Sequence, residues 1–349
     1  MSWQNQNVSK KVVTKVVPLD QEEELLQSIP ENAIITAHEQ NTKTARITYV
    51  IERAVVPEEP ISVTVKPIKL DRKPIKDKVF EGHLAVVNIA DFHLNRKCYA
   101  DENSHRDYDI QTAVSVFTHS IDEVVKTQKQ KKIKRIILNT AGDFLNSDTI
   151  YGTTTAGTKQ NDAVNWKHAF YHGTALLEYA LLKLSNIAPV TYFYVAGNHD
   201  RQVGFYLTSW LAARFVNVDS VEVLDNPNIR ETVSHGSNVL IFTHGDCEGS
   251  RIKNLPYIDP KSKVLLSGAT NIEVLSGHFH SNQVKVDKGV RYETLSSACP
   301  VSDSWTYESG YGGSKPEITI FYYDETDRVG SDSINTLRVL ERIPYESVS

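Results

Sequence analysis

Residues 190–200 read VTYFYVAGNHD and decide the fold: a short, nearly continuous apolar run ends in a glycine followed by Asn198, His199 and Asp200. An apolar run of this length predicts a strand that is buried on both faces. Two earlier stretches have the same design, HLAVVNIAD at 83–91 and KRIILNTAGD at 134–143. Helix patterns separate and follow them, at about 107–126, 163–185 and 202–215. The alternation predicts an α/β protein whose parallel strands are joined by crossover helices.

The second half of the chain is rich in short strand patterns, which predict antiparallel hairpins and, with the first half, a mixed α/β sandwich. These patterns lie at 221–225, 229–233, 238–246, 272–280, 283–295, 318–325 and 336–343.

Residues 1–80 have a different character. They contain a helix pattern at about 21–29, strand patterns at 44–56 and 61–70, and a basic connector with two prolines at 66–78. We therefore predict an N-terminal extension of unknown role, residues 1–80, and a main domain, residues 81–349, with the boundary near residue 79.

The composition excludes several classes of protein. The chain has 349 residues, of which 40% are apolar and 23% charged, so it can form a folded core. Its net charge of −5 argues against a uniformly basic coat for nucleic acid or membranes. The three cysteines, Cys98, Cys247 and Cys299, are too few and too far apart for a disulfide framework or a four-cysteine zinc site. The chain shows neither a signal-peptide pattern nor about 18 consecutive apolar residues, so we expect a cytoplasmic protein without a membrane segment.

Five of the 12 histidines lie in motifs that each close a predicted strand. The motifs are Asp91-Phe92-His93, Gly142-Asp143, Gly197-Asn198-His199-Asp200, His244-Gly245-Asp246 and Gly277-His278-Phe279-His280. The carboxyl ends of strands gather at one edge of an open α/β sheet. In an extended segment residues i and i+2 point to the same side, so Asp91 can share an ion with His93, and His278 can lie with His280 in one site.

The motifs supply seven candidate metal ligands: Asp91, His93, Asp143, Asn198, His244, His278 and His280. Seven ligands are too many for one ion and suit two ions that share a bridging carboxylate. Imidazole nitrogens together with carboxylate oxygens suit manganese, iron, zinc or nickel better than calcium or magnesium. Each motif alone also has an ordinary explanation, as a turn or as a hydrogen-bonded core histidine. The ordered set of five strand ends favours the metal site.

In this order the motifs resemble the signature of the calcineurin-like metallophosphoesterase superfamily, DxH, GD, GNH[DE], H and GHxH, over about residues 83–342. The resemblance implies a four-layer α-β-β-α sandwich that binds two divalent ions, with Mn(2+) the first choice. The implied ligands are Asp91, His93 and His280 for the first ion, Asn198, His244 and His278 for the second, and Asp143 between them.

The resemblance also implies a reaction, the hydrolysis of a phosphoric ester by a metal-bridging hydroxide. His199 would contact the scissile phosphate and the leaving oxygen, and Asp200 would orient His199. These two residues are therefore the expected catalytic pair, and residues 81–349 the catalytic domain.

The residues after the second motif narrow the range of possible substrate classes. Residues 142–148, GDFLNSD, lack the arginine of protein serine/threonine phosphatases, which resemble GDxxDRG. The layout is most similar to DNA-repair exonucleases of the SbcD type and to related phage and bacterial phosphoesterases. Those nucleases usually carry a histidine or aspartate where Asn146 stands. We expect exonuclease-like hydrolysis of phosphodiester bonds in DNA or another nucleic acid. An ATPase partner subunit and homo-oligomer formation are left open.

Two alternatives remain at this point. One is a phosphatase or cyclic-nucleotide phosphodiesterase that acts on a small molecule, and the other is a non-catalytic scaffold with the same fold. Three segments could contact a substrate: the basic run at 126–135, the loop at 147–161 and the aromatic stretch at 305–313. Each also suits a bland role, as a solvated helix end, an ordinary surface loop or local packing.

Overall fold

The computed structural model describes residues 8–29, 33–41, 43–54, 82–103, 106–302 and 315–344. The chain divides into two compact units, Met1–Thr64 and Val65–Ser349. The boundary near residue 79, the connector at 66–78, the strand at 61–70 and the aromatic stretch at 305–313 lie outside the described residues, so these expectations stay predictions.

The N-terminal unit is a three-stranded antiparallel sheet with one short helix. The strand order is β1-β3-β2, and the elements are β1 (Val8–Pro18), α1 (Glu22–Gln27), β2 (Ala33–Gln40) and β3 (Thr44–Ala54). Leu25 of α1 and Ile47 of β3 form the buried centre of this unit, with Val13 and Val17 beside them. The expected helix and the strand at 44–56 are present, whereas β1 and β2 were not anticipated.

The second unit contains a six-stranded sheet of order β14-β13-β4-β5-β6-β7. Strands β4 to β7 are parallel neighbours, and β13 is antiparallel to both β4 and β14. The strands are β4 (His83–Asn88), β5 (Ile133–Asn139), β6 (Val190–Phe193), β7 (Val221–Leu224), β13 (Glu317–Tyr323) and β14 (Arg328–Asn335). The predicted parallel half is confirmed.

A five-stranded sheet of order β11-β12-β10-β9-β8 lies against the first. Its strands are β8 (Glu231–His235), β9 (Asn238–Thr243), β10 (Asn271–Ser276), β11 (Gln283–Asp287) and β12 (Val290–Thr294). The pairs β8–β9 and β11–β12 are antiparallel hairpins, as expected. The prediction of hairpins throughout the second half is nevertheless wrong, because β9, β10 and β12 run parallel to one another.

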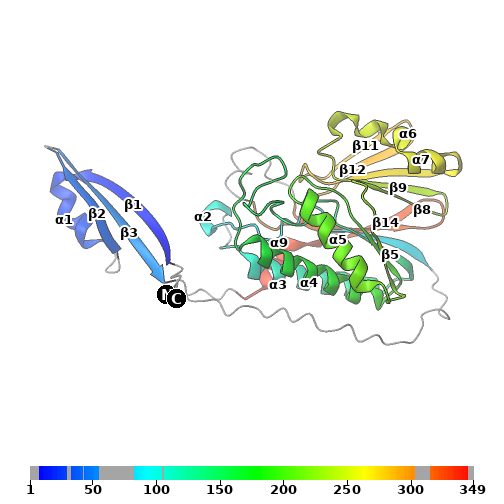
Figure 1. Cartoon of the computed structure of the whole chain (residues 1–349), viewed down its shortest axis with the longest axis horizontal. Coiled ribbons are helices and arrows are strands. Elements are labelled where there is room, and N and C mark those ends of the chain that lie inside the picture. Colours follow the sequence, from blue (N-terminus) through cyan, green and yellow to red (C-terminus); the bar gives the residue numbers. More distant parts are fainter. Residues whose placement is uncertain are drawn as a thin grey trace. The chain divides into compact units, whose positions relative to one another are not determined.

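The alternation of side chains along the strands builds four layers. In β4, Leu84 and Val86 belong to the core between the two sheets, whereas Ala85 and Val87 belong to the core beneath the large helices. Those helices are α3 (Ile110–Gln128), α4 (Trp166–Ser185), α5 (Arg201–Phe215) and α9 (Thr336–Arg342). On the outer face of the second sheet, α6 (Leu255–Ile258) and α7 (Pro260–Leu265) cover a third core. The expected α-β-β-α sandwich is thus confirmed (Figure 1).

One segment forms a helix where we expected a strand. Residues 336–343 were predicted as a strand and form helix α9 instead. The side chain of Asn335 caps this helix by accepting a hydrogen bond from the backbone amide of Arg338. Its buried residues, Thr336, Val339 and Leu340, have the i, i+3, i+4 spacing of a helix face. Among the described helices, none combines the length and the apolar character that a bilayer span requires.

Candidate metal centre and active site

All five motifs begin within a few residues of the carboxyl end of a strand. Asp91, Asp143 and Asn198 follow β4, β5 and β6, which are parallel neighbours in one sheet. His244 and His278 follow β9 and β10, which are parallel neighbours in the other sheet. The carboxyl edges of the two sheets therefore bring the motifs together, as the sequence predicted.

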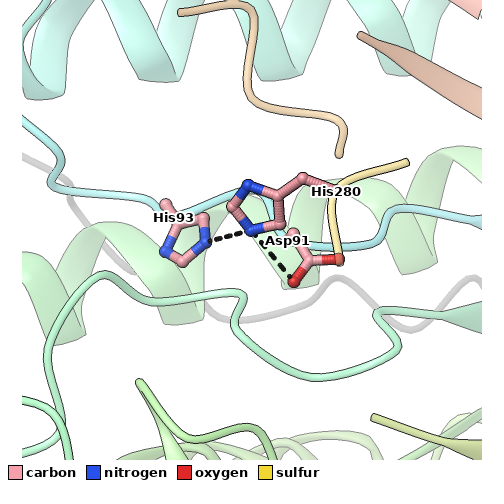
Figure 2. Close-up of side chains that lie close together, drawn as sticks. All are labelled: Asp91, His93 and His280. Carbon is pink, nitrogen blue, oxygen red and sulfur yellow. Dashed lines mark hydrogen bonds and ion pairs between the residues drawn. The ribbon is translucent and has the colours of Figure 1, made fainter. Parts of the chain in front are cut away.

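Asp91, His93 and His280 form a first cluster of potential ligand atoms, all within 4.8 Å of one another. The Nε2 atom of His280 lies 3.1 Å from Nε2 of His93 and 3.4 Å from Oδ1 of Asp91. Figure 2 shows the His280 ring between the other two side chains. Asp91 and His93 are almost fully buried, at 0% and 1% exposure.

A second cluster is formed by Asp143, His244 and His278, again within 4.8 Å. Nε2 of His244 lies 3.1 Å from Oδ2 of Asp143 and 3.1 Å from Oδ1 of Asn198, so Asn198 belongs to the same group. Asp143 also lies within 4.8 Å of His93 and His199. Its carboxylate therefore faces both clusters, which is the position expected of a bridging group.

The backbone at these residues is not extended, contrary to our expectation. We expected Asp91 and His93, and likewise His278 and His280, to share an extended segment. Instead all four have a positive φ, at 50°, 48°, 73° and 52°, and Asp143 has 52°. The side chains converge through left-handed turns rather than through strand alternation. Left-handed conformations of non-glycine residues are unfavourable and concentrate at functional sites.

The glycines of two motifs leave space for ligands that come from other motifs. A Cβ atom at Gly197 would lie 2.0 Å from Oδ1 of Asp143 and 2.3 Å from its backbone nitrogen. A Cβ atom at Gly277 would lie 2.6 Å from Oδ2 of Asp91. The motif glycines therefore allow the loops to approach the carboxylates closely.

His199 and Asp200 are placed differently from the expectation. Nδ1 of His199 lies 2.9 Å from the carbonyl oxygen of Asn146, so a backbone group orients the ring. The buried carboxylate of Asp200 accepts hydrogen bonds from four backbone amides, those of Asp143, Phe144, Leu145 and Gly197. Our expectation that Asp200 orients His199 is thus wrong. Asp200 holds the Asp143 loop against the loop that carries His199.

Burial and charge set the protonation of the clusters. Burial, helped by the charge of Arg96, lowers the pKa of His93 well below its usual value, which favours the neutral imidazole that binds metals. Burial also opposes a charged His244, but the carboxylate of Asp143 overrides this and raises the pKa of His244 to about 10. For Asp143, the charge of His244 outweighs burial and lowers the pKa. The Asp143–His244 pair therefore favours a positive charge beside the carboxylate.

The loop after the second motif is tied to the site by contacts that the sequence did not reveal. The hydroxyl of Thr155 donates to the carbonyl of Asn198 at 2.9 Å. Asp148 accepts hydrogen bonds from the amides of Gln202 and Val203, at the start of α5. The side-chain amide of Asn146 donates to Asp162 at 2.9 Å. In the sequence, the one signal of these contacts is a carboxylate, Asp148, soon after Asp143. A carboxylate at such a position is too common to predict a contact with α5.

The basic run at 126–135 lies away from this edge. It leads into the amino end of β5, opposite the carboxyl edge that carries Asp143. Lys131 pairs with Asp332 at 3.0 Å, Lys134 pairs with Glu325, and Arg135 lies 3.7 Å from Glu222. These pairs favour the interpretation of the run as a solvated segment rather than a substrate-binding one.

The donor set fits divalent ions that bind nitrogen and oxygen. Carboxylates and imidazoles converge from five loops, with Asp91, Asp143, His93 and His244 buried, and two imidazole Nε2 atoms lie 3.1 Å apart. Buried carboxylates and clustered imidazoles are costly unless paired or coordinated to a cation. Asp91, His93 and His280 would hold one ion, and Asp143, Asn198, His244 and His278 the other.

A match to a family model agrees with this chemistry. A family model described as calcineurin-like phosphoesterase matches residues 84–312. A search of curated proteins finds no significant match. A predicted phosphoesterase from Streptococcus pneumoniae TIGR4 is 11% identical, covers 73% of this chain and 91% of its own, and has a TM-score of 0.33. A novel archaeal phosphodiesterase is 13% identical, with coverages of 72% and 99% and a TM-score of 0.35. Vps29 of Entamoeba histolytica, complexed with zinc, is 13% identical, with coverages of 72% and 99% and a TM-score of 0.33.

Proposed function

The chain belongs to the calcineurin-like phosphoesterase family, and on this premise we propose that it is a metal-dependent phosphodiesterase that acts on nucleic acid. The observation that supports the proposal most is the position of Asp143, whose carboxylate lies within 4.8 Å of ligand groups in both clusters. A shared carboxylate between two ligand sets is the arrangement that two-metal hydrolysis requires.

When bound, the ions would supply Lewis-acid chemistry, which activates water near neutral pH and offsets the charge on the phosphate. The residues of the chain that hold them are Asp91, His93, Asp143, Asn198, His244, His278 and His280. We propose manganese as the first choice of ion; mixed imidazole and carboxylate ligands also suit iron, zinc and nickel, and cellular supply decides among them.

His199 is the group that we assign to the leaving oxygen. A carbonyl can only accept a hydrogen bond, so the contact with Asn146 fixes a proton on Nδ1 of His199. Nε2 then faces the site, and when it also carries a proton it can donate that proton to a phosphate oxygen or to the leaving oxygen. General acid catalysis of this kind contributes about 10²–10⁴-fold in rate. The rings of His93 and His199 lie 4.6 Å apart, which places His199 beside the first cluster.

A substrate panel tests the proposal. The protein with manganese would be offered linear single-stranded DNA, linear double-stranded DNA, bis-p-nitrophenyl phosphate and p-nitrophenyl phosphate. We expect hydrolysis of the DNA and of the diester, and little of the monoester. Hydrolysis of the monoester alone would contradict a nuclease and favour a small-molecule phosphatase. Hydrolysis of no substrate, in a protein that binds metal, would favour the scaffold.

A further inference from the structure

Three segments that each carry an exposed aromatic side chain beside a lysine adjoin two of the loops that carry the ligand clusters. Tyr99, Tyr151 and Trp166 are 46%, 75% and 41% exposed. Each has a lysine next to it, and we call these six residues the aromatic rim: Tyr99 with Lys97, Tyr151 with Lys159, and Trp166 with Lys167.

The lysines lie close to their aromatic partners. Nζ of Lys97 is 5.2 Å from the centre of the Tyr99 ring, and Nζ of Lys167 is 5.7 Å from that of Trp166. Nζ of Lys159 donates to the carbonyl oxygen of Tyr151 at 2.5 Å. Each pair thus holds an aromatic residue and a positive charge close together.

Hydrogen bonds join the three segments of the rim into one surface. The backbone amide of Lys97 donates to the carbonyl of Asn161, and the side chain of Asn161 donates back to the carbonyl of Lys97, both at 2.9 Å. The amide of Ala163 donates to the carbonyl of Asn95 at 2.9 Å, just before α4 begins at Trp166.

The same segments border the ligand clusters. Asn95 is two residues beyond His93, and Thr155 of the Tyr151 loop bonds to the carbonyl of Asn198. In Figure 1, α2 (Ala100–Asn103), which follows Tyr99, and the green loops after β5 lie at the same end of the sandwich.

The charge exposed by the Tyr151 loop is positive. The two acids of residues 147–162 point into hydrogen bonds: Asp148 accepts from the amide of Gln202 at the start of α5, and Asp162 accepts from Asn146 and Ser147. Lys159 and Lys167 are exposed. Aromatic rings interleaved with lysines fit a polyanion that has flat bases, because an unpaired base can stack on an exposed ring and a lysine can meet a phosphate.

We propose that the aromatic rim binds a single-stranded nucleic acid segment and guides it to the ligand clusters. The inference rests on the proposed phosphodiester hydrolysis and names its substrate form. Bases inside a duplex are already stacked on their neighbours, so the rim should favour single strands over blunt duplexes.

Binding measured in a chelator tests the rim without relying on catalysis. A fluorescein-labelled oligothymidine would be titrated with full-length protein in EDTA, and its fluorescence anisotropy recorded. Wild type should bind it more tightly than a blunt duplex of equal length. Tyr151→Ala and Trp166→Ala should each weaken binding by about 5- to 140-fold, which is the loss of one base stack. The control is Tyr257→Ala on α6, whose side chain is 45% exposed, close to the 41% of Trp166, and whose binding should match wild type.

The outcomes separate this inference from the proposed function. If wild type, Tyr151→Ala and Trp166→Ala bind the oligothymidine equally, with unchanged melting temperatures, the aromatic rim does not bind single strands. Equal affinity of wild type for blunt duplex and single strand would also contradict the proposal. If wild type with manganese does not hydrolyse bis-p-nitrophenyl phosphate, the proposed function is refuted. The anisotropy result in EDTA would still show whether the aromatic rim binds single strands.

Discussion

Gly197→Ala probes how closely the loops approach Asp143. The added Cβ would lie 2.0 Å from Oδ1 and 2.3 Å from the backbone nitrogen of Asp143, and 2.8 Å from Oδ1 of Asp200. Favourable contacts between heavy atoms need about 3.5 Å, so the atoms must separate by more than about 1 Å. Rotation of the Asp143 side chain cannot relieve the contact, because the backbone nitrogen is also in the way. One of the two loops must therefore move.

The expected cost follows from that displacement. Overpacking in a close-packed region costs about 1–3 kcal/mol, which corresponds to a melting temperature lower by roughly 2–12 °C for a domain of this size. Displacement of a group that positions ligands should reduce metal affinity by about 10–100-fold. A reacting group misplaced by about 1 Å can cost a further 10²-fold in turnover.

Three measurements on one preparation test this prediction. Thermal denaturation gives the stability, calorimetric titration with Mn(2+) gives the affinity, and hydrolysis of bis-p-nitrophenyl phosphate gives the turnover. The matched control is Gly268→Ala, where no heavy atom lies within 4 Å of the added Cβ, and stability should change by no more than about 0.5 kcal/mol. Wild-type affinity for Mn(2+) in Gly197→Ala would refute the reasoning.

Three further substitutions test other parts of the account. His199→Ala should keep the bound metal and lose about 10²–10⁴-fold in turnover, because it removes only the proton donor; loss of metal, measured by mass spectrometry, would assign His199 to the ligands instead. Asp200→Ala should destabilise the fold by at least about 3 kcal/mol, because four buried amides lose their acceptor; an unchanged melting temperature with reduced turnover would restore a direct role in orienting His199. Asn335→Ala should cost about 1 kcal/mol in denaturant unfolding through loss of the α9 cap, and no measurable loss would contradict that cap.

The sequence predicted the strand ends of the main unit well because each combines two signals. An apolar run such as residues 83–91 identifies a buried strand, and the polar motif that follows marks its carboxyl end. The topological rule for open α/β sheets then brings the motifs together without further information.

The elements that were missed are those whose pattern is weak or ambiguous. Residues 336–343 were predicted as a strand, although the cap at Asn335 and the i, i+3, i+4 spacing of Thr336, Val339 and Leu340 both fit a helix. Strand β14 pairs along the sheet edge, and Ile334 is the one buried residue among its eight, so it has no apolar signature. The parallel order of β9, β10 and β12 depends on long-range pairing, which local patterns do not encode.

Within the site, residue types were predictable and local geometry was not. Asp91 and His93 converge through left-handed backbone, which a sequence of non-glycine residues gives no reason to expect. The contact between His199 and Asn146 uses a backbone carbonyl, and a backbone group leaves no mark on the choice of side chain. The family resemblance implied Asp200 as the partner of His199, whereas its carboxylate accepts hydrogen bonds from backbone amides.

The central claim is that the chain hydrolyses phosphodiesters with two ions held around Asp143. The most direct test is the metal content per chain, measured by plasma mass spectrometry after chelation and reloading with Mn(2+), together with hydrolysis of bis-p-nitrophenyl phosphate by the same samples. We expect reloaded wild type to bind two ions per chain and to hydrolyse the diester only after reloading. We expect Asp143→Asn to lose both the two-ion binding and the hydrolysis. Full hydrolysis by the stripped protein, or two retained ions and full activity in Asp143→Asn, would contradict it.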